Sequence, residues 1–276
     1  MVRKILVKTF IGIVLIMLYL PIIWMVVFSF TDTPSFSNWN GFTFDNYVNL
    51  FTGNSKNADL IQNAILNTLF VGFFVSLLST VLGTLGAIGL HAIHNKKIKA
   101  VYSTVNQIPM INSEIVTAIA LALVFNVFAS TFKINDGSWG MTAFKLILAQ
   151  TSFCAPYVLL NVLPRLQKSD NKIYEAALDL GCTPAKAMFK VVLPDILPGI
   201  VVGALLSFTL SIDDFVITKV NVTSFETLST MLYGLKSGKQ PLPADIRALF
   251  TIIFFIVFAL MMVLYSPHKK TEKDKK

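Results

Sequence analysis

The segment Glu175–Pro194, EAALDLGCTPAKAMFKVVLP, is a polar, helix-forming stretch that lies between two strongly apolar segments. Small and charged residues make up most of it, whereas Leu, Ile, Val and Phe dominate the sequence on either side. A loop that joins two membrane spans has no structural need for a compact helix pair of its own. The segment therefore predicts a docking element on a membrane protein.

Start and stop signals divide this segment into two short helices. Asp170 is a suitable N-cap for the first helix, and Gly181 suits the C′ position at its end. Thr183 is expected to cap a second helix that has Pro184 at its first position, where the missing N–H costs nothing. That second helix is expected to end before Pro194. The pattern predicts a helix, a glycine bend and a second helix.

The composition of the segment allows two interpretations. Small residues leave room for another protein surface to approach, and charged side chains at Glu175, Lys186 and Lys190 are suited to fixing its register. The alternative is an amphipathic re-entry loop that lies on the bilayer surface. The physical argument alone favours neither; the small residues are Ala176, Ala177, Ala185 and Ala187.

Outside this segment the chain is apolar enough to cross a membrane several times. Its mean hydropathy is +0.67 and only 14% of its residues are charged, against about 25% in soluble domains. Runs near 20 apolar residues mark membrane spans. We predict an all-α integral membrane protein with six transmembrane helices, at Phe10–Phe30, Ile65–Leu90, Ile108–Phe128, Phe144–Leu163, Ile196–Ile212 and Ala248–Leu264.

Two features exclude a secreted, disulfide-bonded fold. Cys154 falls in a membrane span and Cys182 in the polar segment, so the two do not form a disulfide framework. The first apolar run is long and no small-residue cleavage site follows it, which favours a retained span over a signal peptide.

The distribution of charge predicts the topology. Most of the 23 lysine and arginine residues fall at the N-terminus, near Lys96, in the loop after Leu163 and in the tail at 266–276, whereas the intervening loops are rich in acids. By the positive-inside rule both termini are cytosolic, in a multi-pass protein of the cell membrane. The net charge of +8 then reflects topology and contact with anionic lipid, without nucleic acid. We expect one membrane domain over residues 1–276.

The loops are expected to carry little structure of their own. The outer loop Thr31–Ala64 is rich in turn-forming residues, with a short amphipathic piece at Tyr47–Phe51. The inner loop around His91–Asn106 is short and basic, and the outer segment Asp213–Asp245 ends in a proline pair that stops a helix before the last span.

The spacing in the polar segment resembles the cytoplasmic signature of binding-protein-dependent ABC transporter permeases, E-A-A, three residues, Gly, nine residues, Ile, one residue, Leu-Pro. The resemblance implies a type I ABC importer permease fold, with a coupling loop at 164–195 whose helix sits in a groove of a separate ATPase dimer. One position departs from the signature, where Val stands for Ile. The matching residues are Glu175, Ala176, Ala177, Gly181, Val191, Leu193 and Pro194.

The chain itself carries no recognisable nucleotide-binding or catalytic motif. A phosphate-binding P-loop needs G-x-x-x-x-G-K-[ST] after a strand. The nearest stretch, Gly234–Gln240, is one residue short and lacks the Ser or Thr that holds Mg²⁺. We therefore expect a non-enzymatic subunit that binds no cofactor, with ATP and Mg²⁺ on the partner ATPase.

Acidic residues in or beside the spans are candidates for contact with the solute, because a charge in the bilayer is costly unless it is paired or hydrated. Glu114 lies about seven residues into the third predicted span, roughly 10 Å along a helix. Asp213 and Asp214 end the fifth span, close to Ser211 and Phe215. Glu114 can equally pair with a neighbouring helix or reach water at a frayed helix start, and the two aspartates can equally form a hydrated helix end. The functional alternative is attraction of a cationic solute, aided by a cation–π contact with Phe215.

The stretch SFTLSIDDFVITKV, Ser207–Val220, resembles the corresponding part of spermidine/putrescine permeases. That resemblance implies a polyamine importer that works with a second homologous permease, an ATPase dimer and an external solute-binding protein. An ABC permease for another small solute is the alternative. A self-contained secondary transporter or channel, with the acids coupling ions, is a further one. An intramembrane enzyme is disfavoured because no convincing nucleophile–base pair is present.

Two weaker patterns concern histidines and glycines. His91 and His94 share a helix face, but with no third ligand nearby they favour an interfacial position over a metal site. Two glycine series are spaced for close helix packing. They are Gly199 with Gly203, and Gly83 with Gly86 and Gly89.

Overall fold

The regular secondary structure is entirely helical over the residues that the computed structural model describes, which are 2–33, 39–52, 58–93, 95–132, 138–169, 171–222, 224–237 and 243–265. Five helical stretches are long and apolar enough to cross a membrane, and helix α12, Ala244–Tyr265, covers the sixth predicted span. The prediction of an all-α, multi-pass membrane protein is confirmed. The five stretches are Lys8–Phe28, Asp59–Ala92, Glu114–Thr131, Trp139–Lys168 and Pro184–Asp213.

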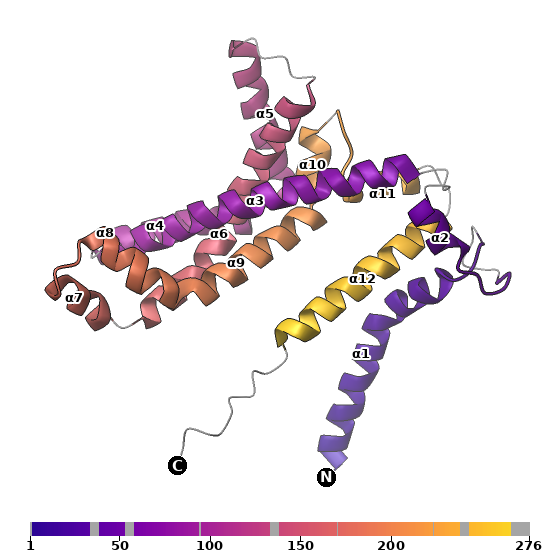
Figure 1. Ribbon diagram of the computed structural model, residues 1–276, viewed down its shortest axis with the longest axis horizontal. Helices are drawn as coiled ribbons and strands as arrows, with labels where there is room; N and C mark the ends of the chain where they lie inside the picture. The colour runs from indigo at the N-terminus through magenta and orange to yellow at the C-terminus, as the bar shows by residue number, and fades with distance from the viewer. Residues whose placement is uncertain are drawn as a thin grey trace. The chain divides into compact units, whose positions relative to one another are not determined.

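The helices fall into two compact units, of which the first comprises residues Met1–Asp59 and Gly234–Lys276. It contains α1 (Val2–Phe28), α2 (Asp45–Thr52) and α12, which packs against both (Figure 1). Helix α2 confirms the amphipathic piece predicted within the outer loop. It also closes the end of α1, because the Asn46 side-chain amide donates to the carbonyl oxygens of Ser29 at 2.9 Å and Thr31 at 3.1 Å.

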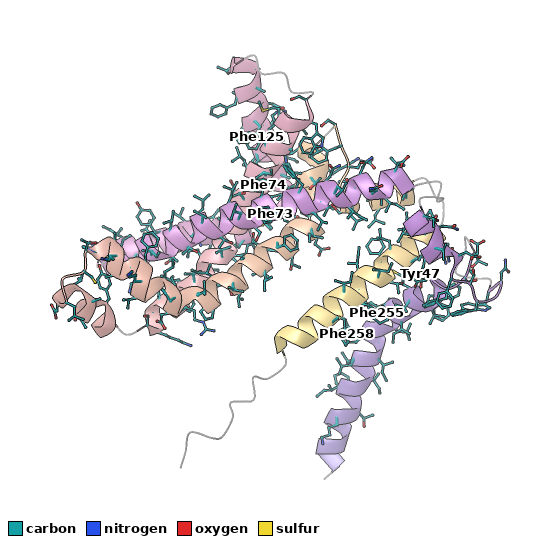
Figure 2. The ribbon with its side chains drawn as sticks, in the orientation of Figure 1. Tyr47, Phe73, Phe74, Phe125, Phe255 and Phe258 are labelled. Carbon is teal, nitrogen blue, oxygen red and sulfur yellow. The ribbon has the colours of Figure 1, made fainter. Side chains whose placement is uncertain are left out.

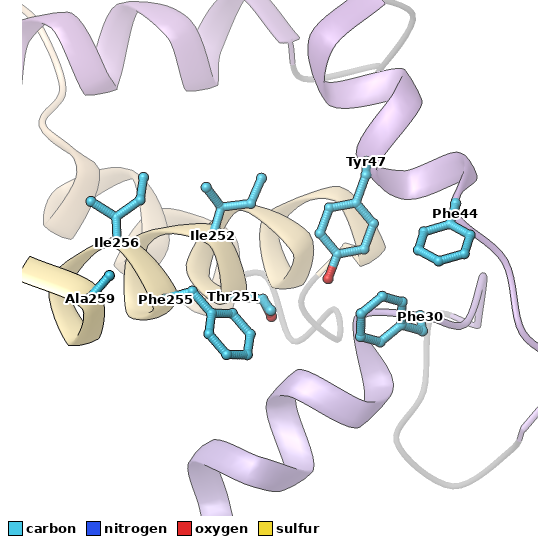
Figure 3. A pocket seen from close by; sticks show the side chains of 8 residues that line it. All are labelled: Phe30, Phe44, Tyr47, Thr251, Ile252, Phe255, Ile256 and Ala259. Carbon is cyan, nitrogen blue, oxygen red and sulfur yellow. The ribbon is translucent and has the colours of Figure 1, made fainter. Parts of the chain in front are cut away.

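An apolar cavity of about 570 Å³ lies between α2 and α12 in the first unit (Figure 3). Phe30, Phe44 and Tyr47 line one side, and Ile252 and Phe255 line the other. The Tyr47 hydroxyl bonds to Ser29 Oγ at 2.6 Å. No charged side chain lines this cavity among the described residues.

The second unit, Leu60–Tyr233, is built on three helices that run side by side (Figure 1). They are α3 (Ala58–Ala92), α6 (Trp139–Lys168) and α9 (Leu193–Asp213). Helices α6 and α9 form the most extensive helix pair in the structure. Around them lie α4 (Lys96–Ile111), α5 (Glu114–Phe132), α7 (Asn171–Asp179), α8 (Pro184–Ala187), α10 (Val216–Asn221) and α11 (Leu228–Ser237).

Glycines allow the three central helices to approach one another closely. A Cβ atom on Gly83 of α3 would lie 2.6 Å from Val158 Cβ of α6, and one on Gly203 of α9 would lie 3.0 Å from Val158 Cγ1. Gly199 likewise abuts Arg165 and Gly86 abuts Leu159, whereas Gly89 faces open space. Close packing at four of the five predicted glycines is confirmed, and Val158 is the side chain on which α3 and α9 converge.

Large apolar side chains cover the outside of the helices. Phe73 on α3 and Phe258 on α12 are 60% and 52% exposed, and many Leu, Ile and Val side chains are exposed with them (Figure 2). An apolar surface on this scale is unusual for a soluble monomer. It matches the hydrocarbon environment that the helix lengths predict.

The third predicted span is not one helix, which corrects the prediction for Ile108–Phe128. Helix α4 extends through Pro109 to Ile111, and α5 begins at Glu114. The break falls at Asn112, whose backbone is extended at φ −69° and ψ 148°, and at Ser113, whose carbonyl accepts from Thr117 N at 3.1 Å. Asn and Ser have a lower helix propensity than Ala or Leu, and the helix ends at these two residues rather than at Pro109. Much of the predicted inner loop at His91–Asn106 is therefore helical.

The segment after Asp214 is also more ordered than the sequence indicates. Helix α10 packs against both α5 and α6. The segment before α11 is tied to α3, because Leu228 N donates to Thr68 Oγ1 at 2.8 Å and Asn67 Nδ2 donates to the Glu226 carbonyl at 3.1 Å. The chain from the end of α9 to Tyr233 therefore forms part of the second unit.

Candidate functional site

The polar segment folds as a helix that ends in a glycine turn. Gly181 has φ +83°, in the left-handed region. Its N–H donates to Leu178 O at 2.9 Å, and the N–H of Cys182 donates to Ala177 O at 3.1 Å. These two bonds define a Schellman motif with Gly181 at C′. The predicted helix end is confirmed, whereas the predicted cap Asp170 lies outside the described residues.

The second helix begins as predicted but does not end as predicted. Thr183 Oγ1 accepts from Lys186 N at 3.4 Å, and Pro184 occupies the first turn of α8. Beyond Ala187 the backbone passes through one π-helical turn, Met188–Val192, and continues without a break into α9. Proline lacks an N–H and its ring collides with the preceding turn of a regular helix. The wider π-turn, in which Leu193 N bonds to Met188 O, offers an alternative backbone register just before Pro194.

The residues of the predicted coupling signature divide between the surface and the core of the second unit. Glu175, Ala176 and Pro194 are exposed, while Ala177 is buried. Leu193 packs on the core cluster formed by α3, α6 and α9. Exposed residues therefore stand at both ends of the signature, while Ala177 and Leu193 are packed inward. Gly181 is exposed and Val191 half-buried.

Two large apolar side chains beside the signature are exposed, and the sequence analysis did not single them out. Leu180 is 86% exposed and Phe189 is 69% exposed. Leu180 lies directly before Gly181, and Phe189 lies in the π-turn. A large apolar residue within an otherwise polar loop was the signal that could have identified them. We call residues 171–194 the coupling segment.

A second group of candidate residues surrounds the end of α9. Asp213 ends the helix and is exposed, whereas Asp214 is only 5% exposed. The Asp214 carboxylate accepts from Ile217 N at 3.1 Å, from Thr218 N at 2.9 Å and from Thr218 Oγ1 at 2.7 Å. Asp214 thus caps the start of α10 and fixes the bend between α9 and α10. The two neighbouring aspartates have different environments, which the sequence did not separate.

Gln150 of α6 joins this bend to the centre of the unit. Its Nε2 donates to Asp214 Oδ2 at 2.8 Å and to Thr218 Oγ1 at 3.0 Å, and its Oε1 accepts from Ser211 Oγ at 2.6 Å. Gln150 is 1% exposed and Ser211 is 5% exposed. One buried amide therefore links α6, α9 and α10. The sequence analysis missed it, although a lone Gln within an apolar span is a signal in itself.

Glu114 lies at the same bend, since α5 packs on α10. Its carboxyl group lies near those of Asp214 and Asp213, whose negative charges act on it. The three acids predicted separately are therefore brought together, and we call them the acidic cluster. Phe215 packs against Tyr233, with ring centroids 4.5 Å apart and ring planes tilted by 37°, so its ring has a fixed neighbour beside the cluster.

Comparison with known proteins gives consistent matches along the chain. Residues 79–270 match the family described as binding-protein-dependent transport system inner membrane component. The chain is 35% identical to the spermidine/putrescine transport system permease protein PotC of Haemophilus influenzae, over 93% of both chains. It is 33% identical to the PotC of Escherichia coli K12, over 94% of this chain and 91% of that protein.

The fold also resembles that of a solved transporter. A bacterial alginate ABC transporter, crystallised in complex with an alginate pentasaccharide-bound periplasmic protein, superposes with a TM-score of 0.67. The match covers 97% of this chain and 92% of that chain, at 21% sequence identity. At this identity the similarity concerns the fold, which is that of an ABC importer permease.

Proposed function

Because the chain belongs to the family of binding-protein-dependent transport system inner membrane components, we propose that it is the permease subunit through which an ATP-driven importer moves polyamines across the cell membrane. The observation that carries this proposal is the 35% identity to a spermidine/putrescine permease over 93% of the chain. The family match over residues 79–270 spans the coupling segment and the acidic cluster.

The coupling segment supports a role in transmission. It presents Glu175, Leu180 and Phe189 to the surroundings, while Leu193 is packed in the core. An exposed apolar pair beside a charged residue is suited to docking in a groove of another protein. We infer that the partner is an ATPase dimer that binds ATP and Mg²⁺, and that this chain performs no catalysis. A second homologous permease and an external solute-binding protein complete the assembly.

The acidic cluster supports a cationic solute. Glu114, Asp213 and Asp214 place carboxyl groups at one bend of the chain, and only Asp213 is exposed. Carboxylates that line a low-dielectric cleft attract cations and raise their local concentration. With both termini cytosolic, the coupling segment faces the ATPase and the bend lies toward the outer side. This orientation follows from the positive-inside rule.

Reconstitution tests the proposal. The chain, its partner permease and the ATPase are inserted in liposomes with the binding protein outside, and uptake of labelled putrescine and spermidine is measured with ATP inside. We expect uptake that requires ATP, and a lower rate in Asp213→Asn. The control is Asp45→Asn, which removes an exposed acid from the first turn of α2. Uptake driven by an ion gradient without ATP would instead identify a secondary transporter.

A further inference from the structure

A polar pocket of the second unit lies apart from the coupling segment and the acidic cluster. Its volume is about 400 Å³, within the range of small-molecule sites. Three parts of the chain form it, namely the start of α3, the start of α6 and the segment before α11. Its polar and aromatic lining consists of Asn63, Asn67, Trp139, Ser224, Phe225 and Glu226. We call it the outer pocket.

The acid of this pocket is Glu226, whose backbone is fixed by hydrogen bonds to α3 while its carboxylate is available to a ligand. Asn67 Nδ2 donates to the Glu226 carbonyl at 3.1 Å, and two residues later Leu228 N donates to Thr68 Oγ1 at 2.8 Å. Glu226 is therefore fixed on α3 although it belongs to a loop. Within the part of the chain that the structure describes, its carboxylate has no hydrogen-bond or ion-pair partner. The Asn67 amide, with its nitrogen engaged, keeps its oxygen as an acceptor.

The aromatic side of the pocket is also fixed. The ring of Trp139 lies between Phe70, at a centroid distance of 5.3 Å, and Phe225, at 5.8 Å. Trp139 is 45% exposed, so part of the indole is open to a ligand. Among aromatic side chains Trp binds cations most strongly. A free carboxylate, an amide oxygen and an indole form a complementary set for an alkylammonium group, which has N–H donors and an apolar chain.

We propose that the outer pocket is a binding site for the ammonium group of an organic cation, occupied before the cation reaches the acidic cluster. Continuity along the chain connects the two places. Ser229 follows Glu226 by three residues, and its Oγ donates to the Asp214 carbonyl at 2.6 Å. A linear solute with amino groups at both ends can engage Glu226 with one and move toward Asp213 with the other. This route rests on the proposed function, whereas binding in the pocket does not.

Thiol protection measures binding without transport. Ser224 lines the pocket and is exposed, so Ser224→Cys in a Cys182→Ser background introduces a reactive thiol there, while Cys154 is buried. In the assembled complex we expect a reagent that carries an ammonium group to react faster than its hydroxyl analogue, and putrescine to slow the reaction. Adding Glu226→Gln should abolish both effects. Equal rates with the two reagents and no protection by putrescine would overturn the site.

Uptake kinetics test whether the site serves transport. Glu226→Gln should raise the KM for putrescine about tenfold, the factor that loss of about 1.4 kcal/mol produces, with the maximal rate little changed. Trp139→Leu should do the same, and Trp139→Phe should restore part of the loss. Asp45→Asn is the control, because it removes one exposed acid from α2. An equal rise in that variant would mean a general charge effect and would refute the assignment.

The two proposals fail in different ways. Import of putrescine by the wild-type complex with no protection at Ser224→Cys would refute the outer pocket alone. Protection that depends on Glu226, without ATP-driven uptake, would refute the proposed function and leave the pocket standing. An unchanged KM in Glu226→Gln, with protection intact, would overturn the place of the pocket on the transport route.

Discussion

Substitution of Gly181 tests whether the geometry of the glycine turn couples ATP hydrolysis to transport. A Cβ atom at this position would meet no atom within 4 Å, so a side chain causes no collision. The cost comes from φ +83°, a conformation in which an L-residue is destabilised by about 1–2 kcal/mol. A β-branched residue is a strong outlier there, whereas Asn is several-fold enriched. Gly181→Val therefore strains the turn, and Gly181→Asn preserves it.

A strain of about 1–2 kcal/mol reduces the population of the native turn by a factor of about 5–30 relative to its alternatives. The strain is confined to the exposed end of α7, so membrane insertion and the α3–α6–α9 core are unaffected. We expect Gly181→Val to lower the amount of solute imported per ATP hydrolysed by a similar factor, with Gly181→Ala intermediate. Gly181→Asn should stay within about twofold of the wild type.

The assay measures uptake and phosphate release in the same proteoliposomes, for equal amounts of assembled complex. A wild-type ratio in Gly181→Val would refute the reasoning. Equal losses in the Val and Asn variants would also refute it, because they would show that the absence of a side chain matters at this position, rather than the left-handed backbone.

Two further substitutions test the packing that holds the site. Gln150→Met removes the amide that bonds to the buried Asp214 carboxylate. We expect this substitution to lower the free energy of unfolding of the purified chain by about 2–3 kcal/mol, because hydrogen bonds to charged groups contribute about 1.5–3 kcal/mol each. Thermal unfolding in detergent measures this, and a loss below about 0.5 kcal/mol would mean that the bend does not depend on the amide. Gly83→Ala places a Cβ atom 2.6 Å from Val158 Cβ and should cost about 1–3 kcal/mol through overpacking. Its matched control on the same helix is Gly89→Ala, because a Cβ atom at that position meets no atom within 4 Å. The control should leave stability unchanged or raise it slightly. Equal melting temperatures for the two variants would contradict the close packing.

Local signals in the sequence predicted the helix ends that depend on one or two residues. The turn at Gly181 and the cap at Thr183 are such cases, because each involves only bonds to residues nearby in the chain. The errors at Pro194 and Asn112 arose from ranking helix breakers by residue type alone. A π-turn precedes Pro194 in a continuous helix, whereas α4 ends at Asn112, where the backbone is extended.

The candidate site was predictable where single residues stand out chemically. Acids in or next to apolar runs were visible, so Glu114, Asp213 and Asp214 could be named as candidates. Their proximity was not visible, because it depends on the break before α5 and on the return of α10. Gln150 was missed for a related reason, since its partner Asp214 lies 64 residues away in the sequence.

The π-turn ahead of Pro194 has a mechanical consequence. The hydrogen-bonded helix continues from Pro184 to Asp213, but it bends between α8 and α9, where the π-turn and two prolines lie (Figure 1). One arm carries the exposed Phe189 and the other ends at Asp213. Such a bend is a hinge: α9 has 21 residues and is about 30 Å long at 1.5 Å per residue, so a rotation of about 5° displaces its far end by about 3 Å. A displacement of that size is comparable to the length of a hydrogen bond, so a small rotation suffices to remake the contacts around the acidic cluster.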